Sequence, residues 1–420
     1  MREIRVGIIG AGVISHRHMT IYENIQRRAR EFGVTAKVVA VSEVDEKKLR
    51  AWAARYGIDE KDCYTDFREM LKRDDIDTVD VCAHNNLHAP LSVAVMRAGK
   101  GCYCEKPMAG SYADTVLMRK VAEETGAKFA VQISSIMTGQ TRMAKKMIED
   151  GELGKVFHAR TNYLARRRRP GLDLRNLSTD FYSSKIGGHG PLFDLGVYHI
   201  SQMLYVMGMP ELKSVYGSAY TEIGAPAAML GGRTYEVEES AFGMAKFEGG
   251  LSLEVSSAWA VNMEQFAAGG DSYITGSKGS LKILGVDCGG GALARPGGAG
   301  GGMGGPPGPR LSFYGNLGGH AVDADLRVAD WMAQDLIVNP RTVLFNDNQV
   351  HWLNYFIGEI SDEERIDTPA IAQATALLSE GIFLSDERGE SVTAEEIKAL
   401  SVSTALWDQE TPWGVFHYDE

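Results

Sequence analysis

The residues best suited to chemistry include a Glu-Lys-Pro run, Glu105-Lys106-Pro107, which ends a short strand-like stretch. Pro107 fixes its own backbone and biases Lys106 toward an extended conformation, so the amino group can be held in one direction. A lysine whose pKa is depressed by burial or by a nearby cation can serve as a general base. On its own such a run is more often a strand end with a solvated lysine. Whether Lys106 is functional therefore depends on the motifs around it in the sequence.

A second group lies in residues 187–199, G-G-H-G-P-L-F-D-L-G-V-Y-H. If this stretch is helical from about residue 192, Asp194 and Tyr198 are four positions apart and share a face, with His199 next in the chain. A carboxylate beside a phenol or an imidazole, together with a lysine, can remove a proton from an alcohol. The relay of that proton is open between Tyr198 and His199. The predicted catalytic residues are Lys106, Asp194, Tyr198 and His199.

A dinucleotide-binding pattern opens the chain. Residues 4–9, I-R-V-G-I-I, predict a buried strand, and G-A-G-V-I-S at 10–15 leads into helical sequence that runs to about Arg30. Ser15 stands where the fingerprint usually has a third Gly or Ala, and it is small enough for close helix–strand packing. The glycines let backbone N–H groups approach a pyrophosphate at the helix N-terminus. The cofactor contacts predicted here are Gly10, Gly12, Val13 and Ile14.

Polar residues also follow the next strands. The strand at 37–42 ends at Glu43, whose carboxylate would bind ribose hydroxyls and repel a 2′-phosphate, which favours NAD over NADP. Asp45 is the alternative, although it also suits a helix N-cap. The strand at 78–83 is followed by Asn85 and His88, of which His88 suits equally a first-turn helix residue. The remaining cofactor contacts predicted are Asn85, His88, Glu105 and Lys106.

The order of these elements predicts two domains. Strands and helices alternate regularly to Gly151, which indicates a doubly wound parallel sheet with right-handed crossovers, and we place this Rossmann domain at 1–133. Long strand-like runs follow, and they predict an α+β domain with an open, largely antiparallel sheet at 134–420. Helices are expected near 323–337, 350–360 and 368–386. Residues 285–309 contain twelve glycines and four prolines and are expected to form an insertion without regular structure.

Composition excludes several classes of function. The 420 residues carry a net charge of −11, which argues against binding to nucleic acid or to an anionic membrane. No apolar run approaches the roughly 20 residues of a membrane span, and the charged opening contains no signal peptide. The five cysteines are odd in number and lack zinc-type spacing, so we expect no metal site and reduced thiols in a cytoplasmic protein.

Residues 166–169 are four consecutive arginines before Pro170. They fit either a solvated loop or a mouth that recognises an oxygen-rich or anionic group. The predicted substrate contacts are Lys106, Arg166, Arg167, Asp194 and His199.

As a set, these motifs resemble the glucose–fructose oxidoreductase/inositol dehydrogenase (Gfo/Idh/MocA) family over about residues 4–400. The residues that carry the resemblance are the N-terminal Gly-x-Gly, Cys82 with Asn85 and His88, A-G-K-x-x-x-x-E-K-P at 98–107, G-E-L-G-K-V at 151–156, G-G-x-G-P-L-x-D-L-G-V at 187–197 and I-T-G-S-K-G at 274–279. The resemblance implies a Rossmann domain, bound NAD(P), and an open-faced second domain that often forms the interface of a homo-oligomer.

The resemblance also implies a reaction, namely hydride transfer from a secondary hydroxyl of a sugar, cyclitol or glycoside to NAD. The family's catalytic lysine corresponds to Lys106 and its carboxylate to Asp194, while its acid–base position is occupied by Tyr198, with His199 one residue later. The arginine-rich loop is similar to that of branches acting on larger glycosides and anhydrosugars, which points to C3 of a glucoside. Two alternatives are a redox-neutral NAD-dependent glycosidase of the same family and a non-catalytic nucleotide-sensing regulatory protein.

Overall fold

The structure, a computed structural model, describes residues 3–263, 270–284, 310–411 and 414–417. The chain forms two compact units. The first unit comprises Met1–Gln132, Val343–Ala370 and Ser403–Glu420, and the second comprises Ile133–Thr342 and Ile371–Val402. The sequence suggested a single boundary near residue 133, whereas the chain returns to the first unit twice after leaving it.

The first unit is built on a six-stranded sheet in the order β3-β2-β1-β4-β5-β6, and all of its pairings are parallel. This confirms the predicted Rossmann fold. Because the chain moves outward from β1 to β3 and then returns to β4, the order reverses between β1 and β4, where doubly wound sheets bind ligands. Its strands are β1 (Glu3–Ile9), β2 (Thr35–Ser42), β3 (Cys63–Tyr64), β4 (Thr78–Val81), β5 (Gly101–Cys104) and β6 (Phe129–Val131).

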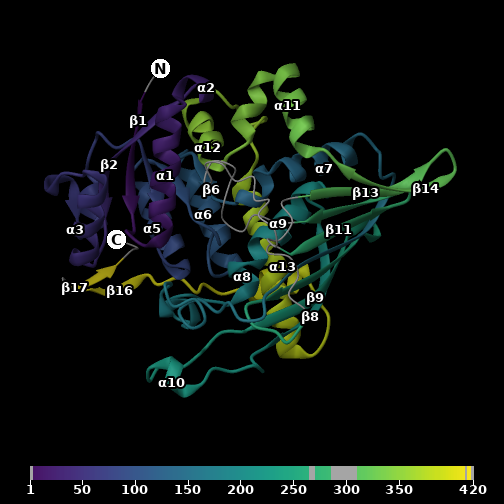
Figure 1. The fold of residues 1–420 in the computed structure, drawn as a ribbon. Coiled ribbons are helices and arrows are strands. Elements are labelled where there is room, and N and C mark those ends of the chain that lie inside the picture. Colours follow the sequence, from purple (N-terminus) through teal and green to yellow (C-terminus); the bar gives the residue numbers. More distant parts are fainter. Residues whose placement is uncertain (1–2, 264–269, 285–309, 412–413, 418–420) are drawn as a thin grey trace. The chain divides into compact units, whose positions relative to one another are not determined.

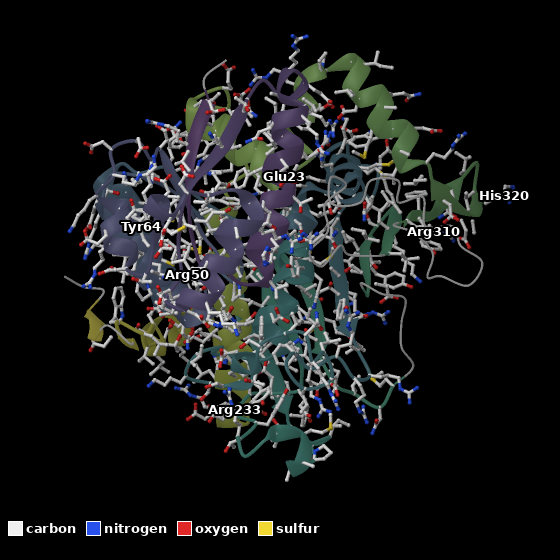
Figure 2. The ribbon with its side chains drawn as sticks, turned by 60° about the vertical axis from the view of Figure 1, so that its left-hand side comes forward. Glu23, Arg50, Tyr64, Arg233, Arg310 and His320 are labelled. Atoms are coloured by element: carbon white, nitrogen blue, oxygen red, sulfur yellow. The ribbon has the colours of Figure 1, made fainter. Side chains whose placement is uncertain are left out.

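The first helix of this unit ends before the predicted Arg30. Arg28 is the C-cap of α1, and a separate short helix, α2, follows. Glu23 on α1 and Arg50 on α3 are exposed and charged, as expected for outward helix faces (Figure 2). The helices are α1 (Val13–Arg27), α2 (Ala29–Phe32), α3 (Glu46–Tyr56), α4 (Phe67–Leu71), α5 (His88–Arg97) and α6 (Tyr112–Thr125).

Helix α12 (Asn348–Ile357) brings a late segment of the chain into the first unit, where it contacts α1 (Figure 1). The fully buried Trp352 stacks on Tyr103 of β5, with ring centroids 5.8 Å apart. Further on, the Thr368 hydroxyl accepts a hydrogen bond from the backbone N–H of Val131 at 2.8 Å. The last described strands, β16 (Asp408–Thr411) and β17 (Gly414–His417), pair as an antiparallel hairpin.

The second unit contains a nine-stranded sheet in the order β14-β13-β12-β11-β7-β10-β9-β8-β15. Only the β7–β10 pair is parallel among its described strands, which confirms a largely antiparallel sheet. Strand β12 pairs with β13, so the glycine-rich insertion, itself outside the described residues, connects two neighbouring strands. The strands are β7 (Val156–Leu164), β8 (Leu212–Tyr220), β9 (Ser240–Phe247), β10 (Ser252–Ala258), β11 (Asp271–Gly276), β12 (Gly279–Leu284), β13 (Arg310–Leu317), β14 (His320–Leu326) and β15 (Val392–Thr393).

Two helix predictions in this unit were partly wrong. The helix expected at 323–337 begins only at Val328, as α11 (Val328–Val338), because the residues before it form β14 and complete the sheet edge beside β13 (Figure 1). The helix expected from residue 192 is two helices, α8 (Pro191–Asp194) and α9 (Gly196–Val206), which are separated at Leu195. There the N–H of Tyr198 donates to the carbonyl of Leu195, so the α-helical hydrogen-bond pattern is interrupted.

Helices cover one face of the nine-stranded sheet, and side chains on the other face are exposed among the described residues of β8 and β9. Gly217 of β8 and Gly243 of β9 lie opposite each other, and a Cβ on either would come within 3 Å of Ile382, so helix α13 (Thr368–Arg388) packs directly on the backbone. On the opposite face Tyr216 and Met244, which are also paired across the strands, are exposed. The remaining helices of the unit include α7 (Gly139–Glu149) and α14 (Ala394–Leu400).

No helix among the described residues is long and apolar enough to cross a membrane. The cysteines within those residues, Cys63, Cys82, Cys102 and Cys104, are free thiols, and Cys288 lies outside them.

Candidate functional site

The glycine turn after β1 leaves the start of helix α1 bare. Gly10 has a φ of 98°, and a Cβ there would lie 2.4 Å from the carbonyl oxygen of Cys82, so only glycine fits. Gly12 caps α1 without any side-chain hydrogen bond, and a Cβ on it would meet nothing within 4 Å. The first turn of α1 has no acidic residue, and Val13 is exposed. The unpaired N–H groups and the helix dipole therefore favour an anion such as a pyrophosphate.

Ser15 closes the base of this turn. Its buried hydroxyl donates to the carbonyl of Gly12 at 2.7 Å and accepts a hydrogen bond from the indole of Trp52 at 2.9 Å. The serine in the third position of the fingerprint thus packs closely, as expected, and also joins α1 to α3. Ile14, in the same first turn, is partly buried.

Glu43 lies beside the glycine turn. One carboxylate oxygen accepts the N–H of Ala11 at 2.9 Å, and the other accepts the N–H of Asp45 at 3.0 Å. These contacts fix an acceptor at the carboxyl end of β2, where ribose hydroxyls are bound in this fold. Asp45 is the N-cap of α3, because its side chain accepts the N–H of Lys48. The bare helix start and the fixed carboxylate together fit NAD.

The Glu105-Lys106-Pro107 turn is held at both ends. Glu105 is buried, and one of its carboxylate oxygens accepts the N–H of Lys106 at 2.9 Å. On the other side, Nδ1 of His88 lies 2.6 Å from the carbonyl oxygen of Pro107, and Nε2 lies 3.1 Å from that of Ala83. The Lys106–Pro107 peptide bond is cis. The hydrogen bonds of Glu105 and His88 thus fix the backbone on either side of Lys106.

His88 is the first residue of α5, and its buried ring contacts backbone carbonyls. Burial lowers the pKa of His88, against the opposing effects of the Pro107 carbonyl and Glu105. Through its contacts with the carbonyl oxygens of Pro107 and Ala83, the ring holds the turn that contains Lys106. Asn85, the other residue predicted after β4, is buried in a short 3₁₀ turn at Asn85–Leu87.

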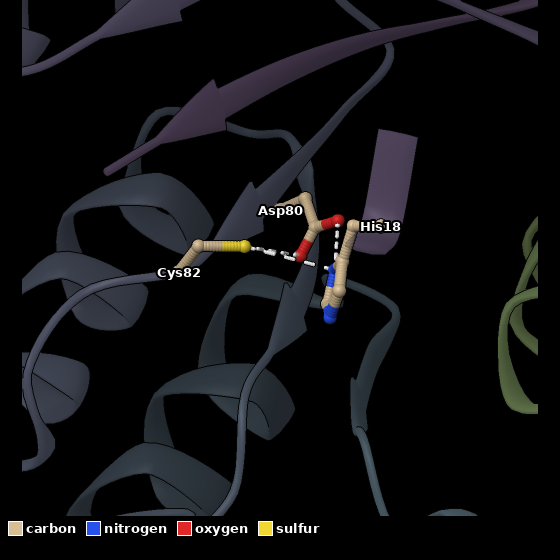
Figure 3. A group of neighbouring side chains, drawn as sticks. All are labelled: His18, Asp80 and Cys82. Carbon is tan, nitrogen blue, oxygen red and sulfur yellow. Dashed lines mark hydrogen bonds and ion pairs between the residues drawn. The ribbon is translucent and has the colours of Figure 1, made fainter. Parts of the chain in front are cut away.

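A buried cluster behind Glu105 was missed by the sequence analysis. His18 of α1 is fully buried, with Nδ1 2.7 Å from Asp80 Oδ2 and Nε2 2.7 Å from Glu105 Oε1. Figure 3 shows the imidazole beside Asp80, with Cys82 just after the strand that carries Asp80. Burial opposes protonation of His18, but the Asp80 carboxylate and Cys82 outweigh it and raise its pKa well above the ordinary value. An aspartate within the apolar strand T-V-D-V was the available signal for this cluster.

In the second unit, Asp194 is held by a tryptophan. It is the last residue of α8, and its Oδ2 accepts the indole N–H of Trp259 at 3.0 Å. Trp259 itself is fully buried in a hydrophobic cluster with Leu172, Tyr182 and Val237. The orientation of the Asp194 carboxylate is thus fixed by a side chain that cannot easily move.

A second carboxyl, Glu238, lies close to Asp194 and was also missed. Its oxygens accept the N–H groups of Gly190 at 2.8 Å and Leu192 at 3.2 Å, at the start of α8. Burial raises the pKa of Glu238 to about 7, and the charge of Asp194 adds to this, although the two amides oppose it. Two nearby carboxyls with different environments are a common arrangement for acid–base chemistry.

The two candidates for the proton relay differ in their surroundings. His199 is fully buried, with Nδ1 3.1 Å from the hydroxyl of Thr161, and its Nε2 has no hydrogen-bond partner within the described residues. Burial lowers its pKa to about 3, which keeps the ring neutral. Tyr198 is 5% exposed, and its carbonyl accepts the hydroxyl of Ser135.

The four arginines separate into one buried and three exposed residues. Arg169 donates to Asp173 at 2.8 Å and to Glu239 at 2.7 Å, and both carboxylates are largely buried. Glu239 in turn accepts the N–H groups of Ile223 and Gly224. Arg169 therefore fixes the loop, which leaves Arg166, Arg167 and Arg168 exposed; Arg167 donates to Asn262 at 3.0 Å.

Comparison with known proteins agrees with this geometry. Residues 4–133 match the profile described as "Oxidoreductase family, NAD-binding Rossmann fold", and residues 141–282 match the "GFO/IDH/MocA C-terminal domain". The fold and the glycine turn thus define an NAD-binding oxidoreductase. The two matches together cover well over half of the sequence, and the chain belongs to the Gfo/Idh/MocA family, as the motifs had indicated.

Several relatives are named dehydrogenases. The chain is 28% identical over 268 residues to the D-glucoside 3-dehydrogenase of Escherichia coli, a match covering 62% of this chain and 72% of that protein. It is 26% identical over 208 residues to the levoglucosan dehydrogenase of Pseudarthrobacter phenanthrenivorans, covering 50% and 52% respectively. The solved structure of a levoglucosan dehydrogenase with NADH and levoglucosan has the same fold, with a TM-score of 0.72 at 19% identity, over 94% of this chain and all of that one.

Proposed function

We propose that the protein oxidises a secondary hydroxyl of a sugar, cyclitol or glycoside, with C3 of a glucoside as the position attacked. The observation that carries this proposal is the fixed lysine turn in the same unit as the glycine turn and Glu43. A neutral amine on a fixed backbone beside a nucleotide site suits proton removal from an alcohol, and an ammonium there would polarise the hydroxyl. The name of the D-glucoside 3-dehydrogenase relative supports the choice of C3.

In this proposal Lys106 is the general base or the group that polarises the reacting hydroxyl. Asp194, held by Trp259, orients the reacting groups, and Glu238 is a nearby carboxyl able to exchange a proton near neutral pH. The burial and low pKa of His199 favour Tyr198 as the relay. Bound NAD supplies the hydride acceptor, and the protein supplies binding, orientation and electrostatics.

The cofactor preference follows from Glu43. Its carboxylate is already fixed by two backbone N–H groups, so a 2′-phosphate would meet a negative charge that cannot turn away. We propose NAD as the physiological cofactor in preference to NADP.

Substrate recognition is proposed for the arginine loop together with Lys106 and Asp194, whereas the fully buried His199 does not suit the substrate contact predicted for it. Arg166 and Arg167 are exposed while Arg169 anchors the loop, and exposed guanidinium groups on a fixed backbone suit an oxygen-rich glycoside.

We also propose a homo-oligomer in the cytoplasm. The exposed face of the second sheet presents Tyr216 and Met244, which suits burial against a second copy. The free thiols of the described cysteines agree with a reducing compartment.

The test offers the protein a panel of cyclitols, free sugars, O- and C-glycosides and anhydrosugars. The absorbance of the reduced cofactor is measured for each compound, with NAD and NADP in parallel. NADH should accumulate with a glycoside and NAD. Consumption of the glycoside without net NADH would instead indicate a redox-neutral glycosidase. Nucleotide binding without turnover of any compound would indicate a sensing protein.

The lysine is tested by Lys106→Met, which should abolish turnover while the Kd for NAD changes little. Lys100→Met is a matched control, because Lys100 donates to the carbonyls of Arg73 and Ile76 on the same unit. The control should lower thermal stability yet retain turnover. Retained activity in Lys106→Met would refute the assignment.

A further inference from the structure

We propose that His18 is a positioning residue for the reaction, whose doubly protonated ring holds the Glu105 carboxylate and, through it, the backbone of Lys106. The inference rests on the proposed role of Lys106 and extends it to a residue that touches neither substrate nor nucleotide in that proposal. It starts from two contacts of 2.7 Å, one from each ring nitrogen of His18 to a different carboxylate.

The chemistry of these contacts fixes the protonation of the ring. An ionised carboxylate can only accept hydrogen bonds, so each ring nitrogen must donate one. A ring that donates from both nitrogens is an imidazolium. His18 is fully buried, and a buried cation is costly unless it is paired and hydrogen-bonded on all sides, as it is here between Asp80 and Glu105.

Asp80 is the fixed side of this arrangement. Besides His18, its carboxylate accepts the Tyr22 hydroxyl at 3.2 Å and contacts the Cys82 thiol at 3.6 Å. It also lies on β4, in the middle of the parallel sheet between β1 and β5. Asp80 thus holds the imidazolium from a strand that cannot shift without disturbing its neighbours.

Glu105 is the side that transmits the constraint. One oxygen accepts from His18, while the other accepts the N–H of Lys106 at 2.9 Å. Burial raises the pKa of Glu105, but the hydrogen bond and charge of His18, together with the charge of Lys106, lower it overall. The carboxylate therefore stays ionised, and the chain of contacts runs from β4 through His18 and Glu105 to the lysine backbone.

Other charged and titratable groups near the ring do not replace these partners. Asp347 accepts the N–H groups of Gln349 and Val350 at the start of α12, and its pKa is raised by burial although His18 and Arg17 oppose this. The ring of Tyr103 lies 6.0 Å from that of His18, centroid to centroid.

A metal ion is the rival explanation for this cluster. His18, Asp80 and Cys82 offer ligand atoms within 4.8 Å of one another, the one such group found among the described residues. A metal would need Nδ1 of His18 without its proton, whereas the proposal needs that proton to be present. The two explanations therefore predict opposite protonation states for Nδ1 of His18.

The first experiment needs no substrate. The full-length protein is labelled with ¹⁵N-histidine, and ring nitrogen shifts are followed from pH 6 to pH 9 by NMR. One buried ring should keep both N–H protons at pH 8, where an ordinary imidazole is mostly neutral. That ring is assigned by its absence in His18→Gln or by its slowest exchange with solvent. A ring with one proton, or one metal ion per chain that a chelator removes, would overturn the proposal.

The second experiment measures coupling to the reaction. His18→Gln should lower kcat on the order of 100-fold, the cost of a small misplacement of a reacting group, while the Kd for NAD stays within about threefold of wild type. Tyr22→Phe is the matched control, because it removes one donor to Asp80 but leaves the contacts of the His18 ring with Asp80 and Glu105. The control should keep wild-type kcat.

A double-mutant cycle with Glu105→Gln separates positioning from general destabilisation. If His18 acts through Glu105, either single variant already breaks the chain of contacts from His18 to Lys106. The kcat of the double variant should then be no lower than that of the slower single variant. Effects on kcat that multiply would refute the proposal. If no substrate is turned over by any variant or by wild type, the proposed function has failed, and the ring protonation still decides the proposal on His18.

Discussion

The contact between Trp259 and Asp194 can be tested by removing one hydrogen-bond donor. Trp259→Phe keeps an aromatic ring in the cluster with Leu172 and Tyr182 but loses the indole N–H that Asp194 accepts at 3.0 Å. The carboxylate would then lose this donor, and the geometry in which it acts would be populated less often.

The expected size of the effect follows from the charge on the acceptor. A hydrogen bond to a charged group contributes about 1.5–3 kcal/mol. If that orientation matters only in the transition state, kcat/KM should fall by roughly 10- to 100-fold, since about 1.4 kcal/mol corresponds to a factor of ten. The buried ring also becomes smaller, so stability should fall as well.

A matched control separates these two effects. Trp352 is equally buried, but its indole N–H has no hydrogen-bond partner among the described residues, so Trp352→Phe shrinks a ring without removing a hydrogen bond. Both variants should lower the melting temperature, and only Trp259→Phe should lower kcat/KM at a temperature where both are folded. Equal kcat/KM in the two variants would refute the proposed role of Trp259.

Three further changes have definite expected outcomes. Gly10→Ala places a Cβ 2.4 Å from the Cys82 carbonyl at a φ of 98°; strain of about 1–3 kcal/mol should weaken NAD binding at least about tenfold in calorimetric titration, and unchanged affinity would contradict the site. Because burial raises the pKa of Glu238 from 4.5 to about 7, stability should decrease as pH rises between these values, and Glu238→Gln should flatten that dependence in thermal melts at pH 5 and pH 8. Arg169→Met removes the cation from Asp173 and Glu239, which keep their backbone N–H donors, and should cost about 3–5 kcal/mol in denaturant unfolding; a loss below about 1 kcal/mol would show that the loop has another anchor.

The parts of the fold that the sequence predicted are those governed by local patterns. The glycine turn and the regular alternation of strands and helices both depend on residues close together in the chain. The last residues of β14 were mistaken for helix because the pairing that defines them is with β13, whereas locally Ala324 and Leu326 favour helix and Asp323 and Asp325 disfavour strand.

The missed site residues share a different cause. His18 meets partners that are 62 and 87 positions away, and Glu238 meets amides 48 and 46 positions away. In the sequence His18 is one polar residue of a helix, and Glu238 is one of two glutamates before a strand. Only the tertiary fold turns them into a buried cation and a carboxyl that titrates near neutral pH.

The first unit of the structure includes later segments of the chain that lie outside the matched Rossmann region. The Rossmann family profile ends at residue 133, yet Tyr103 needs Trp352 as a stacking partner, and Val131 donates its N–H to Thr368. A fragment cut after residue 133 would expose the surface that α12 covers and would be prone to aggregate. An exchange of this domain between relatives would therefore have to include residues 343–370. If a protease cut the chain between residues 133 and 342, the segments 1–132 and 343–370 should stay associated.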